Sequence, residues 1–198
     1  MVLREHPMLM VGTDPVEVER LLVSGELSCP DCDGVLRPWG HARARPARGP
    51  EGTVRHRPRR ACCASCRGTH VLLPALWLLR RADAAAVIGA ALEAKAAGAG
   101  HRVIAAASGR PVSTVRGWLR RFAAGAEQTR TEFTRLLHAL DPVAAALRPR
   151  GSVVGDALEA IGRAAAAAVV RLTPIGPWEF AARATGGRLL APPAGSRW

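Results

Sequence analysis

Apolar residues recur at helical spacing over most of the chain beyond residue 82. A stripe that begins at Val87 and ends at Leu92 predicts a helix, with Asp83 as its N-terminal cap and Gly98 near its end. A second stripe, over residues 133–140, has apolar residues three and four positions apart. The chain after residue 82 is therefore predicted to be helical nearly throughout.

The C-terminal part continues this pattern. Asp141-Pro142 predicts the start of a short helix, and residues 153–172 predict a longer one with alanines through its middle. Because alanine lets helices approach closely, this run is either buried within the chain or the seam of a homodimer. Pro177 would begin a last helical turn that ends at Gly186-Gly187, and residues 191–198 are expected to be loose.

The N-terminal part has a different pattern. Asp14 precedes a proline and predicts a helix start, with Glu17 reaching back to complete the cap and Gly25 at the helix end. Further along, residues 35–41 and 54–61 predict two strand-like arms. The prolines and glycines between these arms, at residues 46–52, predict a loop, so we expect a hairpin with an enlarged tip.

Two Cys-x-x-Cys pairs stand at the ends of this hairpin. Cys29 and Cys32 form the first pair, Cys63 and Cys66 the second, and a glycine stands two residues beyond each pair. Two thiolates at this spacing can hold one ion only where the backbone turns sharply, which glycine permits at positive φ. Four sulfurs make up the ligand set of a closed tetrahedral zinc site. We therefore predict that these four cysteines bind Zn²⁺ and that folding of the ribbon depends on it.

Other ligand sets remain open. The interval between Cys32 and Cys63 exceeds the usual one of about 15–20 residues, and the enlarged hairpin accounts for the excess. Cys62 would pair at a wider spacing than Cys63, which makes Cys63 the better ligand. His41 and His70 stay open as substitute ligands, and disulfides or unligated thiols as alternatives to zinc.

Charge is distributed unevenly along the chain, whose net charge is +12. Residues 37–81 hold eleven arginines against one acid, Glu51, and residues 101–121 hold five arginines and no acid. A basic block repels itself unless an anionic partner neutralises it, and arginine matches the phosphate oxygens of nucleic acid. A solvated basic face is the alternative. The arginines expected to contact phosphates are Arg43, Arg45, Arg55, Arg57, Arg59, Arg60, Arg110 and Arg121.

Residues 101–120 form the second candidate site, because their pattern is that of a helix-turn-helix. Ala105 would lie where two helices cross, and Gly109, four residues on, would form the turn. Val115 and Trp118 would place an apolar face of the second helix on the first. The remaining face would enter a major groove and read bases. It carries Ser113, Thr114, Arg116 and Arg120.

An ordinary helical hairpin with a glycine turn is the alternative interpretation of this segment. Gly117 is unexpected within its second helix, since glycine there costs about 1 kcal/mol relative to alanine. A close approach of DNA or of a neighbouring helix would explain it. The chain has no tyrosine and only 4% aromatic residues, so it offers no stacking platform for single strands, and duplex DNA is favoured.

A family resemblance rests on four motifs in this order: Cys-Pro-x-Cys-x-Gly, the arginine-rich hairpin, the second Cys-x-x-Cys, and Ser-Thr-Val-Arg-x-Trp-Leu-Arg. Together they resemble the zinc-ribbon and helix-turn-helix region of insertion-sequence transposases, and they are similar to related small stand-alone bacterial proteins. The likeness covers about residues 27–122. It implies a ribbon that holds zinc and a helix-turn-helix that binds element ends or promoter DNA, with Ser113, Thr114 and Arg116 facing the bases.

These features predict a mainly α fold with a small β zinc ribbon. The predicted division is an N-terminal helical segment (1–26), a zinc ribbon (27–73), a helix-turn-helix domain (82–124), a C-terminal helical region (125–190) and a loose tail (191–198).

The acids of the C-terminal part do not predict an enzyme. Six acids follow Phe122, all on segments predicted to be helical, whereas paired-metal phosphoryl transfer needs carboxylates that converge from a rigid scaffold. We expect a sequence-specific duplex DNA-binding protein without catalytic activity, either a transcription regulator or an accessory factor of a mobile element. The alternatives are an adaptor that docks on RNA polymerase or a transposase and, less favoured, a nuclease or transposase fragment.

The expected location is the cytoplasm. No stretch reaches the ~18–20 apolar residues of a membrane span, and the first twelve residues lack the basic start and apolar block of a signal peptide. Thiols stay reduced in the cytosol, where cysteine clusters bind metals more often than they form disulfides.

Overall fold

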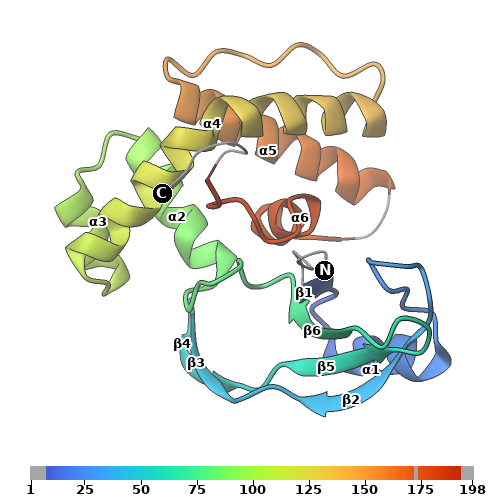
Figure 1. The fold of residues 1–198 in the computed structure, drawn as a ribbon. Helices are drawn as coiled ribbons and strands as arrows, with labels where there is room; N and C mark the ends of the chain where they lie inside the picture. The colour runs from blue at the N-terminus through green and yellow to red at the C-terminus, as the bar shows by residue number, and fades with distance from the viewer. Residues whose placement is uncertain (1–7, 172–173, 193–198) are drawn as a thin grey trace.

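The computed structural model describes residues 8–171 and 174–192. A β-rich part and a helical part lie one above the other, with α6 nearest the sheet (Figure 1). The two parts have largely separate hydrophobic cores. Among the helices of the described residues, none combines the length and the hydrophobicity needed to cross a membrane.

The β-rich part contains a four-stranded sheet in the order β1-β6-β5-β2. Strand β1 runs parallel to β6, and the other neighbours are antiparallel. A separate two-stranded sheet, β3-β4, extends from it. The strands are β1 (Met8–Val11), β2 (Leu36–His41), β3 (Arg45–Gly49), β4 (Gly52–His56), β5 (Arg59–Cys63) and β6 (Thr69–Pro74).

The predicted single hairpin is wrong in its connectivity. Residues 46–52 are not a loop but belong to a second hairpin, β3-β4. They form most of β3, the turn at Pro50-Glu51 and the first residue of β4. The arm predicted over 54–61 is divided between β4 and β5 at Pro58, which has no N–H to donate to a ladder. Strand β2 therefore pairs with β5, and the arginine-rich insertion forms its own ribbon.

Helix α1 (Pro15–Ser24) confirms the predicted start and end. The Asp14 carboxylate accepts a hydrogen bond from the Val16 N–H, and Gly25 adopts the left-handed conformation at the C-terminus. Glu17 does not reach back to the cap, because its carboxylate binds the guanidinium of Arg20 instead. The buried side of α1 packs into the core of the β-rich part, beside Leu36 and Cys29.

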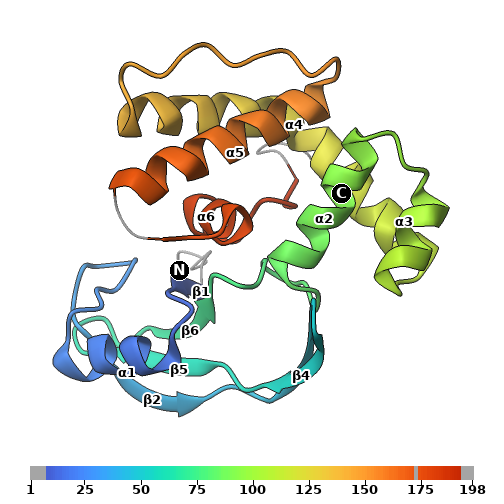
Figure 2. The same cartoon turned by 180° about the vertical axis from the view of Figure 1, so that it is seen from behind.

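The helical part consists of α2 (Ala85–Ala96), α3 (His101–Ser108), α4 (Val112–Leu140), α5 (Val153–Arg171) and α6 (Pro177–Ala184). Helix α5 packs along the second half of α4, as both views show (Figures 1 and 2). Helix α6 lies beneath them, where Phe180 meets Phe133 edge-on at a centroid distance of 6.0 Å. The predicted mainly helical C-terminal part is therefore confirmed.

Two predictions for this part are corrected. The second helix predicted within residues 101–120 continues to Leu140 as one 29-residue helix, because buried residues recur every three or four positions along it. No helix begins at Asp141-Pro142. There the Asp141 carboxylate accepts from the Val143 N–H in a turn, and irregular chain follows as far as Gly151 and Ser152.

The alanine-rich face of α5 is buried within the chain. Ala157, Ala160, Ala164, Ala165 and Ala168 are at most 2% exposed and belong to the core shared with α4 and α6. This favours the intramolecular alternative over a dimer seam on that face. The predicted loose tail lies outside the described residues beyond Pro192.

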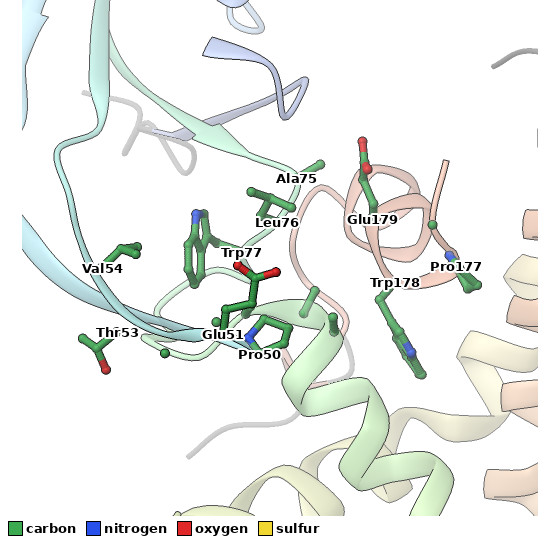
Figure 3. Close-up of a pocket in the computed structure, with 16 residues that line it drawn as sticks. Pro50, Glu51, Thr53, Val54, Ala75, Leu76, Trp77, Pro177, Trp178 and Glu179 are labelled. Atoms are coloured by element: carbon green, nitrogen blue, oxygen red, sulfur yellow. The ribbon is translucent and has the colours of Figure 1, made fainter. Parts of the chain in front are cut away.

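An open apolar cavity of about 570 Å³ lies at the junction of the two parts. The tip of the β3-β4 hairpin forms one wall, Trp77 and the start of α2 a second, and the start of α6 with Trp178 a third (Figure 3). Trp178 lies directly over Gly89 of α2, where a Cβ would overlap the indole ring.

Candidate functional site: a cysteine cluster and a helix-turn-helix

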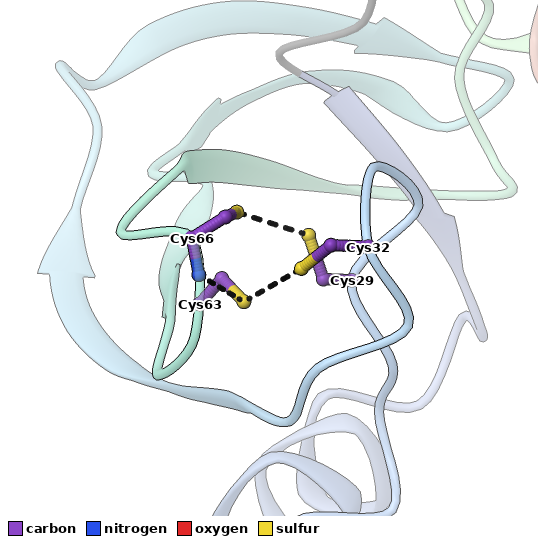
Figure 4. A group of neighbouring side chains, drawn as sticks. All are labelled: Cys29, Cys32, Cys63 and Cys66. Carbon is purple, nitrogen blue, oxygen red and sulfur yellow. Dashed lines mark hydrogen bonds between the residues drawn. The ribbon is translucent and has the colours of Figure 1, made fainter.

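The four predicted cysteines converge at one end of the sheet. Their sulfur atoms all lie within 4.8 Å of one another, with Cys29 Sγ 3.8 Å from Cys66 Sγ and Cys32 Sγ 3.5 Å from Cys63 Sγ (Figure 4). Cys29 and Cys63 are buried, whereas Cys32 faces solvent. Two loops from distant parts of the sequence thus present four sulfurs to one point, an arrangement that could hold a metal ion.

The two cysteine loops have the same backbone geometry. The Cys29 N–H donates to Gly34 O at 2.7 Å, and the Cys63 N–H donates to Gly68 O at 2.8 Å. In each loop the residue after the second cysteine is left-handed, with φ 56° at Asp33 and 61° at Arg67. The expectation that the glycines themselves supply positive φ is wrong, since that conformation falls one residue earlier.

Gly34 is needed for space instead. A Cβ on Gly34 would lie 2.5 Å from Ser65 Oγ and 3.0 Å from Cys63 Sγ. The first cysteine loop therefore approaches the second so closely that only glycine fits at the contact. This close approach brings the two pairs of sulfurs together.

The electrostatics of the cluster differ from one thiol to another. The Cys66 N–H donates to Cys63 Sγ at 3.4 Å and, as the largest cause, lowers the pKa of the Cys63 thiol to about 6. Burial raises the pKa of the Cys29 thiol to about 12. Amide donors to sulfur and a four-sulfur set fit a metal-bound tetrathiolate, in which a cation would stabilise the charge that burial opposes at Cys29.

His70 is the second candidate ligand near the cluster. It is 2% exposed, and its Nε2 lies 3.4 Å from Cys29 Sγ and 3.9 Å from Asp31 Oδ2. An alternative group of ligands thus consists of Cys29, Asp31 and His70. The sequence did not predict this group, because Asp31 lies between the two cysteines of the first pair. His41 belongs to no such group among the described residues, and the Cys62 sulfur points to backbone carbonyls.

The helix-turn-helix is formed by α3 and α4, with α2 packed behind them. Gly109 adopts φ 62° and ends α3, and Ala105 is buried where the helices cross. Val115 and Trp118 are buried against Ile104 in the core shared with α2. The predicted packing of these residues is therefore present in the structure.

The opposite face of α4 is open to solvent. Ser113, Arg116 and Arg120 are exposed, and Thr114 is half-buried. No ion pair within the described residues engages Arg116 or Arg120. The residues predicted to read bases thus lie on one accessible surface of the helix.

The arginines predicted to contact phosphates fall into two groups. Arg43, Arg45, Arg55 and Arg57 are exposed on or beside the β3-β4 hairpin, and Arg60 and Arg121 are half-buried. Arg59 and Arg110 are engaged within the chain. Arg59 binds Glu19 through two hydrogen bonds of 2.7 and 2.9 Å, which lower the pKa of the Glu19 carboxyl.

Arg110 is bound to Asp83, which does not cap α2 as predicted. Asp83 is 3% exposed and accepts hydrogen bonds from Arg110 Nε at 2.6 Å and from two nitrogens of Arg48 at 2.9 Å each. The N-cap of α2 is Ala84, without a side-chain bond, because two guanidiniums hold the Asp83 carboxylate away from the helix. This ion pair joins β3 to the turn before α4.

Backbone hydrogen bonds reinforce this link. The Arg48 N–H donates to Ala82 O at 2.7 Å, and the Ala84 N–H donates to Arg48 O at 2.9 Å. Asp83 could have been noticed in the sequence as the only acid within residues 52–92. An isolated acid among arginines is a signal for a buried ion pair, although the sequence does not say which arginines it binds.

Comparison with known proteins supports the second site. Residues 79–130 match the family described as Homeodomain-like domain. The match spans α2, α3 and the first two-thirds of α4, so this part of the chain is a helix-turn-helix region of the DNA-binding kind. Searches of curated proteins and of solved structures found no match to the chain.

Proposed function

We propose that this protein binds duplex DNA sequence-specifically and that a Zn²⁺ ion holds its β-rich part in the binding conformation. The observation that carries the proposal is the match of residues 79–130 to a helix-turn-helix family, together with the open arginine-bearing face of α4. In this class of domain the exposed face of the second helix enters the major groove. Ser113, Thr114, Arg116 and Arg120 would contact base edges there.

The proposed role of the β-rich part is to grip the DNA backbone. The β3-β4 hairpin is joined to the helix-turn-helix by the ion pairs of Asp83. Exposed arginines lie on or beside this hairpin: Arg43, Arg45, Arg55 and Arg57. Phosphate contacts orient a protein on the duplex, and base contacts supply the sequence preference. Since Arg59 and Arg110 already bind carboxylates, the proposed phosphate contacts rest on the exposed arginines.

Zinc is the proposed metal because four thiolates in a closed site are its typical structural ligands. Cys29, Cys32, Cys63 and Cys66 would hold it, and its charge would offset the cost of burying thiolates at that position. We place the protein in the cytoplasm, where thiols stay reduced. Its role would be transcription regulation or assistance to the separate recombinase of a mobile element, with RNA polymerase or a transposase as the partner.

Two arginines on different surfaces test this proposal. Arg116→Ala removes a base contact and should reduce discrimination between the preferred and a random duplex by about 1–3 kcal/mol. Arg57→Ala removes a phosphate contact and should weaken binding to both duplexes about equally. Fluorescence anisotropy with both duplexes, at several salt concentrations, measures the two effects.

Each of the two substitutions has its own result that would contradict the proposal. Equal losses on both duplexes for Arg116→Ala would show that α4 does not read bases. Full binding by Arg57→Ala at every salt concentration would remove the hairpin from the interface. Arg163→Ala serves as the control, because this arginine carries the same charge and lies on α5, which belongs to neither proposed surface.

A further inference from the structure

Three arginines from two segments gather beside the middle of α4. Arg80 and Arg81 lie in the turn between β6 and α2, and Arg121 lies on α4 itself. Burial lowers the pKa of the Arg81 guanidinium, and the charges of Arg121 and Arg80 lower it further. Among the described residues no carboxylate lies within ion-pair distance of these three side chains. The cluster therefore concentrates positive charge without an internal counterion.

The turn that carries the first two arginines is held in an unfavourable conformation. Arg80 is left-handed, with φ 58°, which costs a residue with a side chain about 1–2 kcal/mol. The Arg81 N–H closes the turn onto Leu78 O at 3.2 Å, and the Leu79 N–H anchors it to Gly187 O at 2.9 Å. Arg81 Nε is buried and has no hydrogen-bond partner. Such a donor is costly to bury unless a ligand accepts from it.

Gly117 explains the position of the third arginine. A Cβ on Gly117 would lie 2.8 Å from Arg121 Nη1, one turn further along α4. The guanidinium of Arg121 thus lies against the bare backbone of Gly117 and uses space that any other residue would fill. Gly125 on the same helix has nothing within 4 Å of its Cβ position, so crowding of this kind is not general to α4.

We propose that Arg80, Arg81 and Arg121 form a phosphate-binding site and that Gly117 positions the Arg121 guanidinium in it. Three guanidiniums with unused donors are suited to phosphate oxygens, which they can bind through paired hydrogen bonds. The phosphate would belong to the DNA backbone, because Arg121 lies about two helical turns beyond Thr114 of the base-reading face, on the same side of α4. The choice of duplex as the ligand rests on the proposed function.

The site fixes the register of α4 in the groove. A phosphate held beside Gly117 and Arg121 would lie at the middle of the interface, between the base-reading residues and the start of α2. Arg80 and Arg81 come from the turn that joins β6 to α2, so one phosphate would contact both that turn and α4. Phosphate contacts of this kind set orientation without reading sequence.

Gly117→Ala tests the positioning role, with Gly125→Ala as the matched control. Alanine is the better helix former, so both variants should fold with a melting temperature equal to or above that of the wild type. Gly117→Ala displaces Arg121 and should weaken duplex binding severalfold. Gly125→Ala should leave binding unchanged. Equal affinities for the two variants and the wild type would overturn the positioning role of Gly117.

Arg81→Ala and Arg121→Ala test the phosphate contact, with Arg135→Ala as an exposed control on α4. For each of the first two variants, the plot of log K for duplex binding against log salt concentration should become less steep by about one. The control should not change its steepness. Unchanged slopes in a wild type that binds duplex would overturn the site alone. Absence of duplex binding by the wild type would overturn the proposed function as well.

Inorganic pyrophosphate distinguishes a duplex phosphate from a free phosphate ligand. We expect no saturable heat when it is titrated into the wild-type protein in a calorimeter. Saturable binding that Arg121→Ala abolishes, together with unchanged salt slopes on duplex, would contradict the assignment to DNA.

Discussion

Gly34 marks the point where the two cysteine loops come closest. Its missing side chain leaves room for Ser65 and for the sulfur of Cys63, whereas the left-handed positions of the two loops are occupied by Asp33 and Arg67. A glycine in a cysteine loop is usually expected both to leave space and to adopt positive φ. Here these two roles are divided between neighbouring residues.

Gly34→Ala should separate these roles. The added methyl group forces the loops apart, so we expect a loss of stability on the order of 1–3 kcal/mol and weaker metal retention. Arg67→Gly is the control, because glycine is at least as suited to a left-handed position and should be close to neutral. Thermal unfolding and metal content measure both effects. A Gly34→Ala protein with wild-type stability and metal content would contradict the account of the loops.

At this scale the sequence predicted residue types better than residue contacts. The four cysteines, Gly109, Val115 and Trp118 were predictable because each follows from a local pattern of spacing. The partners of Asp83, Arg59 and Arg121 were not predictable. Those contacts join segments far apart in the sequence or depend on the direction of a long side chain, and no local pattern encodes either.

Among the elements, the β3-β4 hairpin and the helix-turn-helix are linked through one buried carboxylate. Asp83 accepts hydrogen bonds from Arg48 of β3 and from Arg110 of the turn before α4. The hairpin arginines are thereby held at a fixed position relative to α4. Elements that are positioned together bind one duplex with less loss of conformational freedom.

Asp83→Asn should weaken this link. Removing one charge from a buried ion pair is strongly destabilising, and because Arg48 is 39% exposed we expect a loss on the order of 2 kcal/mol. Duplex affinity should fall in addition, at temperatures where the variant remains folded. Glu127→Gln breaks the exposed pair with Arg130 and should change stability by no more than about 0.5 kcal/mol.

Denaturant unfolding and anisotropy on the same samples distinguish the two effects of Asp83→Asn. Loss of stability with full duplex affinity would mean that Asp83 is structural only. An effect on stability no larger than that of Glu127→Gln would contradict the buried ion pair itself.

Element boundaries followed from the sequence where a cap or a proline marks them. Helix α1 begins directly after its cap Asp14 and ends directly before Gly25 as predicted, and α6 begins at Pro177. Strands β1, β3 and β6 were missed, because β1 is four residues long and both β3 and β6 contain a proline. The length of α4 was missed because the helix-turn-helix pattern covers only its first turns, whereas packing against α5 and α6 continues the helix beyond them.

In the whole molecule, the β-rich part and the helical part differ in what holds them together. The helical core contains large apolar side chains such as Phe122, Phe133 and Ile161, whereas the core around the cysteines is small. A part with so little buried apolar surface depends on an additional cross-link. The metal would supply that cross-link for the β-rich part alone.

Metal removal should therefore unfold one part and spare the other. A chelator under reducing conditions should abolish the β-rich part and weaken duplex binding, while most of the helical circular dichroism remains. Cys63→Ser should reproduce this result, and Cys62→Ser, next to it in the chain, should not. Cooperative loss of all helical signal on chelation would show that the two parts fold as one unit.

Sequence-specific recognition of duplex DNA is the central claim, and selection of bound duplexes from a random pool tests it most directly. The wild-type protein, with its zinc content measured on the same sample, should enrich one short sequence motif and contain one zinc ion per chain. The Arg116→Ala protein should enrich a less specific motif. A pool that shows no enrichment after repeated rounds, with folded and zinc-loaded protein, would contradict the claim.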